Sequence, residues 1–370
     1  MENSSPTPAV PAAAREIERP QPIIRADVMS HVVFRRRDVA EMDRFLRDFG
    51  LVPCPSTGQT KYYRGHGSAA YLVAIEPASE DAFVGFGVSV SERDDLARLA
   101  EATGRPIEAA EGPGGGERVR LTDPDGLLVD VTHGVAEAEP LPTRTQTVPV
   151  NTPGFKARIN AVVRTPLEPW PIFRLGHVVL QRPDFDRATH WYMEHLGIIA
   201  SDVQVLPDGR PVMGFFRLDR GPEPADHHSI AILGGPASGL LHVSFETFDI
   251  EAVGQGHQFL RARGWTPFWG IGRHDLGSQV FDYWKDPAGA EWEHYADGDV
   301  MDASQPTGYH AFHRGTLWAW GDDLPDDLRP DIAIEAIPAI HAAGGFGAMP
   351  LDRVDALMKA LLIQPRPWMR

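Results

Sequence analysis

The sequence is poor in cysteine, in basic blocks and in long apolar runs. Cys54 is the only cysteine among 370 residues, which excludes an internal disulfide and argues against a cysteine-ligated zinc site. The longest basic run is the three arginines at 35–37, and the net charge is −16, so nucleic acid and anionic membranes are poor partner candidates. No apolar stretch approaches the roughly 18 residues needed to span a bilayer. We therefore expect a cytoplasmic protein without nucleic-acid or membrane partners.

Composition and turn residues divide the chain into two similar halves. Residues 1–26 are rich in Pro and Ala and predict a disordered N-terminal arm. Residues 27–134 and 171–325 each carry the strand and helix patterns of one domain, and the proline-rich residues 135–170 predict a linker. Apolar residues at helical spacing predict a helical extension over 326–370.

Three residues of the second half predict a metal site. His177 in LGHVVL and His242 in LLHVSFE lie within aliphatic and β-branched runs that predict buried strands. Glu293 lies on a short strand after the Asp-Pro-Ala-Gly turn at 286–289, where a buried carboxylate needs a cation. Two imidazoles and one carboxylate from three strands form the facial triad that binds Fe(II) and leaves three coordination positions open.

An internal repeat relates the two halves. SHVVF at 30–34 matches GHVVL at 176–180, and LTDPDGLLVDV at 121–131 matches WKDPAGAEWEH at 284–294. The repeat predicts that both halves share one fold.

The repeat also predicts which half is active. In this match His31 aligns with His177 and Asp130 aligns with Glu293. Gly87, however, occupies the position where the second half has His242. Without the second imidazole the first half makes a poor metal site, so we expect it to have kept the fold and lost the metal. Of the 15 histidines, 11 lie from 177 to 313, which favours a site in the second half.

A longer pattern in the second half resembles the type I extradiol ring-cleaving dioxygenases, which are catechol 2,3-dioxygenase-like members of the vicinal oxygen chelate (glyoxalase/bleomycin resistance) superfamily. The pattern is Gly-Arg-His at 272–274, then Tyr283, the Asp-Pro-Ala-Gly turn and Glu293. It departs from the family at Asp282, where an aliphatic or aromatic residue is usual, and this predicts a local polar contact or a small register change.

The resemblance implies an α+β fold of tandem βαβββ modules, whose mixed sheets form cups with helices outside. It implies that the two histidines and the glutamate named above hold Fe(II), although the same donor set also suits Mn(II). His228 matches the family's acid–base histidine, and His274 and Tyr283 match the residues that hydrogen-bond the substrate. Strand alternation points His227 the other way, and the family's acidic position three residues after the substrate histidine is Gly277 here.

The activity that the resemblance implies is cleavage of a catecholic ring by O2 in aromatic compound catabolism. A dioxygenase of the 4-hydroxyphenylpyruvate type and a non-enzymatic ligand-sequestering protein of the same fold remain alternatives. Expected partners are a small aromatic diol, O2 and further copies of the chain in a homo-oligomer. Six aromatic residues are candidates for the lining of an apolar pocket: Trp191, Tyr192, Phe268, Trp269, Phe281 and Trp284.

Overall fold

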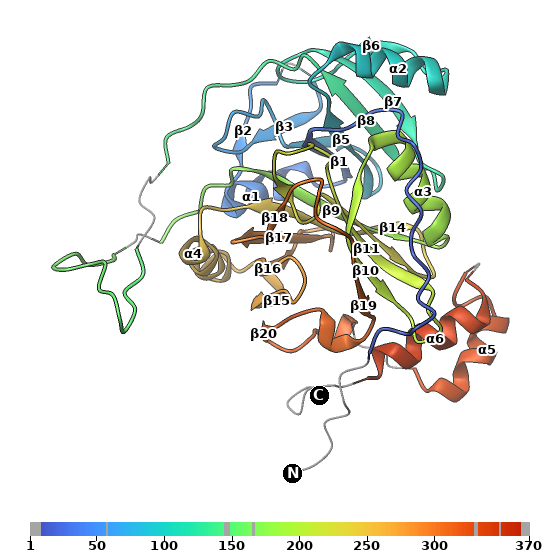
Figure 1. The fold of residues 1–370 in the computed structure, drawn as a ribbon. Helices are drawn as coiled ribbons and strands as arrows, with labels where there is room; N and C mark the ends of the chain where they lie inside the picture. Colours follow the sequence, from blue (N-terminus) through green and yellow to red (C-terminus); the bar gives the residue numbers. More distant parts are fainter. Residues whose placement is uncertain are drawn as a thin grey trace.

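Two mixed β-sheets, one from each half of the chain, form the body of the protein in the computed structural model (Figure 1). The structure describes residues 9–56, 58–143, 149–164, 167–328, 332–347 and 349–363. The first half contains β1 (Val28–Arg36), α1 (Val39–Phe49), β2 (Val52–Pro53), β3 (Lys61–Arg64), β4 (Val73–Pro77), β5 (Ala82–Ser89), α2 (Arg93–Thr103), β6 (Ile107–Ala109), β7 (Glu117–Thr122) and β8 (Leu128–His133).

The second half repeats this order with one extra two-residue strand inserted, and then adds further short elements. Its elements are β9 (Arg174–Arg182), α3 (Phe185–Leu196), β10 (Ile199–Val205), β11 (Pro211–Arg217), β12 (Ala225–Asp226), β13 (Ile230–Gly234), β14 (Gly239–Glu246), α4 (Ile250–Ala262), β15 (Thr266–Arg273), β16 (Val280–Lys285), β17 (Glu291–Ala296), β18 (Val300–Met301), β19 (Gly308–Ala311), η1 (Arg314–Thr316), β20 (Trp320–Gly321), η2 (Asp326–Leu328), η3 (Ile334–Ala336), α5 (Ile337–Ala342) and α6 (Leu351–Leu361).

Each half contains two βαβββ units rather than one. In the first sheet, with the order β2-β3-β4-β1-β5-β8-β7-β6, the central strands β1 and β5 are antiparallel and each begins one unit. In the second sheet β9 and β14 occupy the same central places. The vicinal oxygen chelate fold expected from the sequence is therefore confirmed, with four βαβββ units in the described part of the chain.

Helix boundaries follow the capping residues read from the sequence. Asp38 and Asp184 precede α1 and α3, and their side chains accept hydrogen bonds from backbone N–H groups three residues later, at 2.8 and 3.0 Å. Gly50 and Gly197 end the same two helices in the left-handed conformation, with φ of 108° and 71°. Local sequence thus fixed where these helices start and stop.

The Asp-Pro turn of each half is held by an arginine of the other half. Arg36, at the end of β1, places Nη2 2.5 Å from Asp286 Oδ2. Arg182, at the equivalent end of β9, places Nη2 2.7 Å from Asp123 Oδ2. All four side chains are buried. These two reciprocal ion pairs fix the orientation of one half against the other.

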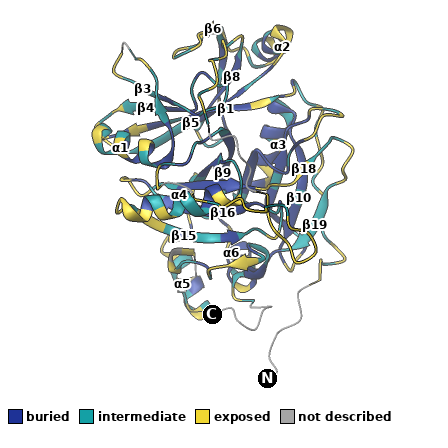
Figure 2. Ribbon diagram, turned by 90° about the vertical axis from the view of Figure 1, so that its left-hand side faces the viewer, coloured by how far each residue is buried: buried dark blue, intermediate teal, exposed yellow. Residues whose placement is uncertain are grey.

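An aromatic core joins the halves around Trp292 of β17. Its ring stacks on Phe245 at 5.3 Å and on Phe34 at 5.2 Å, and the rings of Phe45 and Phe49 from α1 meet it edge-on. Figure 2 shows the central strands as buried while α2 and α4 keep an exposed side. Burial of such large rings contributes strongly to stability, so the halves share one core.

The described part of the N-terminal segment runs along the second half in extended form. Arg15 N donates to Gly209 O at 2.9 Å, and Ile23 N donates to Glu194 O at 2.7 Å. In Figure 1 this dark blue segment passes beside α3 toward α6. This packing differs from the disordered arm expected for residues 1–26, because apolar residues near its end become buried; residues 1–8 lie outside the described range.

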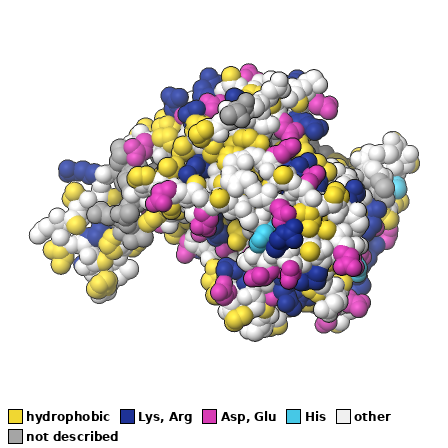
Figure 3. Space-filling model, turned by 90° about the horizontal axis from the view of Figure 1, so that it is seen from above, with side chains coloured by type: hydrophobic (Ala, Val, Ile, Leu, Met, Phe, Trp, Pro, Cys, Tyr) yellow, Lys and Arg dark blue, Asp and Glu magenta, His cyan; other side chains and the backbone are white. Residues whose placement is uncertain are grey.

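Helices α5 and α6 cover the second sheet at the edge near β11. Their apolar residues join one cluster with strand residues of this sheet, and Arg353 of α6 donates from Nη2 to Pro211 O at 2.8 Å. Among the described residues, no helix combines the length and apolarity needed to cross a membrane. Basic and acidic side chains are interspersed on the face shown in Figure 3, which presents no continuous basic surface there.

Candidate functional site

Three neighbouring strands bring His177, His242 and Glu293 together. On β14, which lies between β9 and β17, Ser244 pairs with His177 on one side and with Glu293 on the other. His242 lies two residues before Ser244 on the same strand. The three ligand atoms lie close to one another: His177 Nε2 is 3.3 Å from His242 Nε2 and 3.1 Å from Glu293 Oε2. His242 Nε2 is 3.5 Å from the same oxygen. The sequence predicted this grouping from three segments far apart in the chain.

The geometry of these atoms fits a bound metal ion. Metal–ligand bonds of about 2.1 Å at right angles put neighbouring ligand atoms about 3.0 Å apart, close to the spacing of the three atoms. Glu293 is 0% exposed, and neither of its oxygens accepts a hydrogen bond within the described chain. A buried carboxylate without hydrogen bonds is costly unless a cation compensates it. The triad is therefore suited to bind a divalent metal.

The protonation of His242 also suits metal binding. Burial lowers the pKa of His242 to about 3, and this outweighs the opposing effect of the Glu293 carboxylate. At neutral pH the imidazole is then uncharged, as a metal ligand must be.

His274 and Tyr283 lie directly beside the triad. Tyr283 pairs with Glu293 across β16 and β17, and its hydroxyl is 2.9 Å from His274 Nε2. His274 Nδ1 donates to the carbonyl oxygen of Leu317 at 2.7 Å, which leaves Nε2 directed toward the tyrosine hydroxyl. Burial, and then the Glu293 charge, raise the pKa of Tyr283 well above its usual value. The phenol therefore stays protonated and can donate a hydrogen bond.

His228 faces the triad from the bend that precedes β13. Its ring centroid is 4.2 Å from that of His177. Burial, and then the imidazoles of His177 and His227, lower the pKa of His228 well below its usual value. The ring is thus neutral near pH 7 and can accept a proton.

His227 does not point away, as strand alternation had predicted. It lies in a bend between β12 and β13, where alternation does not apply, and its Nδ1 is 3.0 Å from His228 Nδ1. Its Nε2 is 2.6 Å from Asp202 Oδ2, and the other Asp202 oxygen is 2.7 Å from His310 Nε2. Sequence reasoning missed Asp202, because nothing local relates it to a histidine pair 25 residues later.

Asp202 is ionised across the physiological range. Burial opposes ionisation, but hydrogen bonds from His227 and His310 outweigh it and lower the pKa of Asp202 to about 2. The same hydrogen bond raises the pKa of His310. The carboxylate is therefore a hydrogen-bond acceptor only.

Asp282, the departure from the family pattern, makes a polar contact on the far face of the sheet. Its Oδ1 is 2.8 Å from His257 Nδ1 of α4, and its Oδ2 accepts from Trp284 Nε1 at 2.6 Å. The register of β16 is unchanged, since Tyr283 still pairs with Glu293. Of the two expected consequences, the polar contact is the one that occurs.

The six aromatic residues proposed for the pocket divide between several places. The ring centroid of Phe281 lies 4.3 Å from that of His274, and the ring of Trp269 lies at a tilt 4.3 Å from Phe281 and stacks on Tyr283. The Tyr192 hydroxyl instead donates a hydrogen bond to Asp123, the carboxylate that pairs with Arg182 between the two halves. Trp284 points to the far face of the sheet. The prediction was therefore wrong for these last two residues, because strand and helix faces send them into other parts of the core.

The segment 312–324 covers one side of the site and was not predicted to do so. Besides the Leu317 carbonyl, Asp322 O accepts a hydrogen bond from Trp269 Nε1 at 2.9 Å. Trp318 meets the ring of Trp269 edge-on at 5.7 Å, and both are buried. This segment shields the His274 side of the site from water.

The first half has an ion pair where the second half has its triad. His31 pairs with Gly87, as His177 pairs with Ser244, so the residue in the position of His242 is Gly85 and not the predicted Gly87. The mismatch reflects a two-residue shift that the sequence match could not detect. Either way no second imidazole is present.

The carboxylate of the first half already has a cationic partner. Arg120 binds both oxygens of Asp130, at 2.7 and 2.8 Å, while His31 Nε2 stays 3.9 Å away. Burial lowers the pKa of His31 to about 4, against the attraction of Asp130. Among the described residues, the triad of the second half is the only group of three that could hold a metal ion.

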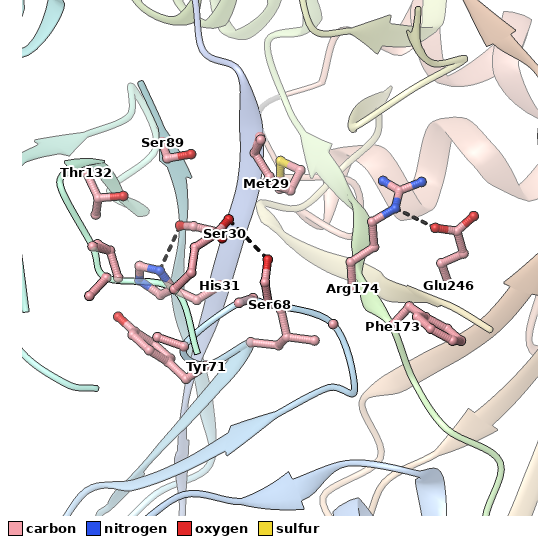
Figure 4. Close-up of a pocket in the computed structure, with 18 of the residues that line it drawn as sticks. Met29, Ser30, His31, Ser68, Tyr71, Ser89, Thr132, Phe173, Arg174 and Glu246 are labelled. Carbon is pink, nitrogen blue, oxygen red and sulfur yellow. Dashed lines mark hydrogen bonds and ion pairs between the residues drawn. The ribbon is translucent and has the colours of Figure 1, made fainter. Parts of the chain in front are cut away.

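A cavity of about 860 Å³ opens between the first half and the start of β9. Figure 4 shows Ser30, His31 and Tyr71 on one side of it and the ion pair of Arg174 and Glu246 on the other. The hydroxyl of Ser30 is 2.9 Å from His31 Nδ1, and Tyr71 packs against the same ring. None of the six predicted site residues lines this cavity within the described chain, so it is separate from the candidate metal site.

Comparison with known proteins agrees with this geometry. Residues 174–294 match the model of the Glyoxalase/Bleomycin resistance protein/Dioxygenase superfamily. The chain is 30% identical over 302 residues to Metapyrocatechase 2 of Cupriavidus necator, covering 80% of this chain and 90% of that protein. It is 26% identical over 274 residues to the biphenyl-2,3-diol 1,2-dioxygenase of Pseudomonas sp. (strain KKS102), covering 70% and 84%.

The fold agrees with a solved structure as well. The homoprotocatechuate 2,3-dioxygenase of Brevibacterium fuscum, in complex with 3,4-dihydroxyphenylacetate, superposes with a TM-score of 0.68 at 20% identity and covers 84% of this chain and 94% of that chain. A likeness at 20% identity shows that the two proteins share a fold. The 30% identity to Metapyrocatechase 2 over most of both chains shows the family. The chain therefore belongs to the extradiol ring-cleaving dioxygenases of the glyoxalase/bleomycin resistance protein/dioxygenase superfamily.

Proposed function

We propose that this protein is an Fe(II)-dependent extradiol dioxygenase that opens the ring of a small aromatic diol with O2. The observation that carries the proposal is the convergence of His177, His242 and Glu293 on a buried point beside His274 and Tyr283. The names of the two relatives, a metapyrocatechase and a biphenyl-2,3-diol 1,2-dioxygenase, support an aromatic diol as substrate.

In this proposal the three converging side chains hold the metal. Their two nitrogens and one oxygen suit Fe(II), and Mn(II) as well. When bound, the metal supplies Lewis acidity to the diol oxygens and the redox chemistry with O2 that cleaves the ring.

Tyr283 and His274 bind and orient the substrate. The protonated Tyr283 hydroxyl donates to a substrate oxygen, and such a bond to a charged oxygen contributes about 1.5–3 kcal/mol. The Leu317 carbonyl fixes the ring of His274, so its Nε2 keeps one orientation. The aromatic side chains of Trp269 and Phe281 exclude water from this side.

His228 is the acid–base group. It enters the reaction neutral, takes a proton from a substrate hydroxyl, and returns it to the opening ring. The ring of His228 lies beside that of His177, with 4.2 Å between the centroids, which supports a role next to the metal ligands rather than as one of them.

We also propose that residues 171–325 form the catalytic domain and 27–134 a metal-free domain of the same fold, joined by the linker at 135–170. The helical extension proposed at 326–370, of which residues 329–331, 348 and 364–370 lie outside the described range, supplies a surface for a homo-oligomer in this proposal. The single cysteine suits the reducing cytoplasm.

The test is anaerobic reconstitution with Fe(II), followed by mixing with catechol, 3-methylcatechol or 2,3-dihydroxybiphenyl in air. We expect O2 uptake matched by the visible absorbance of a ring-opened product. His242→Ala should abolish both signals, whereas the matched control His190→Ala, on the exposed side of α3, should keep them.

Two results would contradict the proposal. O2 uptake with 2-oxo acids but with none of the three diols would indicate chemistry of the 4-hydroxyphenylpyruvate type. Tight binding of a diol without metal and without turnover would indicate a sequestering protein.

A further inference from the structure

A line of four polar side chains runs from the candidate site toward the surface. The Nδ1 atoms of His228 and His227 lie 3.0 Å apart. His227 Nε2 is 2.6 Å from Asp202 Oδ2, and Asp202 Oδ1 is 2.7 Å from His310 Nε2. His228 is 4% exposed, whereas the side chain of His310 is 38% exposed. The line connects a buried imidazole beside the metal ligands with one that meets solvent.

Three separate segments build this line. Asp202 lies on β10 and His310 on β19, and these two strands are parallel neighbours. The histidine pair lies in the bend between β12 and β13, where His227 N also donates to Asp299 O at 2.8 Å. The bend is therefore held through its backbone by Asp299 and through the His227 side chain by Asp202.

Gly277 leaves the space that His227 occupies. Its φ is +82°, and a Cβ at this position would lie 2.8 Å from His227 Nδ1, the atom that contacts His228. The Gly277 carbonyl accepts a hydrogen bond from Asp299 N at 2.9 Å, so the glycine and the bend are held together. A larger residue would push apart the two histidines.

The hydrogen-bond partners determine where the hydrogens lie. An ionised carboxylate only accepts, so His227 donates its Nε2 hydrogen to Asp202. A neutral His227 then carries its lone pair on Nδ1, and His228 must donate from its own Nδ1. This leaves the lone pair of His228 on Nε2, the only ring nitrogen free for a ligand.

We infer that His227 and Asp202 are positioning residues that hold His228 in this tautomer, with Nε2 ready to accept a proton. The inference rests on the acid–base role proposed for His228. When Nε2 takes up a proton, the hydrogen on Nδ1 can cross the 3.0 Å hydrogen bond to His227. One N–H bond breaks at His228 and one forms at His227. The positive charge then lies beside the Asp202 carboxylate, which stabilises it.

His227→Phe tests the inference, because it keeps a ring and removes both nitrogens. We expect kcat with catechol to fall about 100-fold, within the range of acid–base catalysis. KM and metal content should change less than about twofold, because the variant leaves the ligands and Tyr283 in place.

A double-mutant cycle shows whether His227 acts through His228. The double variant His227→Phe/His228→Ala should have the same kcat as His228→Ala alone, since the positioning residue has nothing left to position. Losses that multiply would overturn the inference.

His257→Phe is the matched control. His257 also hydrogen-bonds a buried aspartate, Asp282, at 2.8 Å, but on the far face of the same sheet. This variant should lose stability and keep kcat. If it lowers kcat as much as His227→Phe does, the effect of His227 is structural and the inference fails.

A spectroscopic measurement separates this inference from the proposed function. The ¹⁵N shifts of His228 in the zinc-loaded protein report which ring nitrogen carries hydrogen, without any turnover. Hydrogen on Nδ1 in the wild type, moving to Nε2 in His227→Phe, would support the inference. Hydrogen on Nε2 in the wild type would overturn it, whereas a wild type that turns over no diol would count against the proposed function alone.

Discussion

Metal binding should stabilise this protein through Glu293, and Glu293→Gln is the substitution that tests it. The wild-type carboxylate is 0% exposed and accepts no hydrogen bond within the described chain. A metal ion compensates its charge, while glutamine has the same shape without the charge. The metal-free and metal-loaded proteins should therefore respond to this substitution in different ways.

The expected magnitudes follow from linkage. Free metal at 100 times its dissociation constant stabilises the wild type by about 2.7 kcal/mol. With an unfolding entropy of about 2.1 cal/mol/K per residue, this raises Tm by about 3.5 °C for a chain of 370 residues. If Glu293→Gln weakens binding about 100-fold, the same metal concentration contributes about 0.4 kcal/mol, or about 0.5 °C.

The metal-free proteins should show the opposite order. Glutamine removes a buried charge that has no metal partner in this state, so metal-free Glu293→Gln should be at least as stable as the metal-free wild type. Glu291→Gln, two residues earlier on β17 and outside the triad, is the control and should keep the full metal-dependent shift.

Thermal unfolding with and without Fe(II) under anaerobic conditions, combined with metal analysis, measures these differences. The reasoning is refuted if Glu293→Gln keeps the wild-type shift and binds one metal per chain. It is also refuted if the metal-free variant is clearly less stable than the metal-free wild type, since Glu293 would then act as a structural hydrogen-bond acceptor.

Three further predictions follow from the contacts. Tyr283→Phe removes one hydroxyl that contacts His274 and should lower kcat/KM for catechol about 10- to 100-fold while leaving Tm unchanged within error; an equal loss of Tm would indicate a structural role. Arg182→Met leaves the buried Asp123 carboxylate without its cation and should lower the free energy of unfolding in urea by about 3–5 kcal/mol, whereas a loss under 1 kcal/mol would contradict the ion pair's importance. Asp202→Asn should be less stable than the wild type by about 1–2 kcal/mol above pH 4, and because the pKa of Asp202 is lowered to about 2, this difference should shrink as pH falls toward 2; a difference independent of pH would show that the charge plays no part.

Much of the site was predictable because its signals are local. Each ligand lies in a recognisable strand, and the turn at 286–289 sets the register that pairs Tyr283 with Glu293. The capping residues Asp38 and Gly50 likewise fixed the limits of α1. In these cases the residue and the reason for its position lie within a few positions of each other.

Other features could not be read in the same way. Gly85 rather than Gly87 occupies the place of His242, because β-strand register depends on partners outside the segment. The arm at 9–26 packs on the second half because the surface that receives it forms only on folding. Helix and strand faces, not residue type, decided that Tyr192 and Trp284 lie away from the site.

The sequence by itself determined the repeated fold, the lack of a second imidazole in the first half and the candidate ligands, since each depends on residue periodicity, turn residues or the types of donor side chain, which can be read along the chain. Tertiary structure alone decided what surrounds them. It pairs Arg36 and Arg182 with the turns of the opposite halves, and it places Asp202 against His227. These contacts join residues 25 to 250 positions apart, and hydrogen bonds over such separations become visible only once the chain has folded.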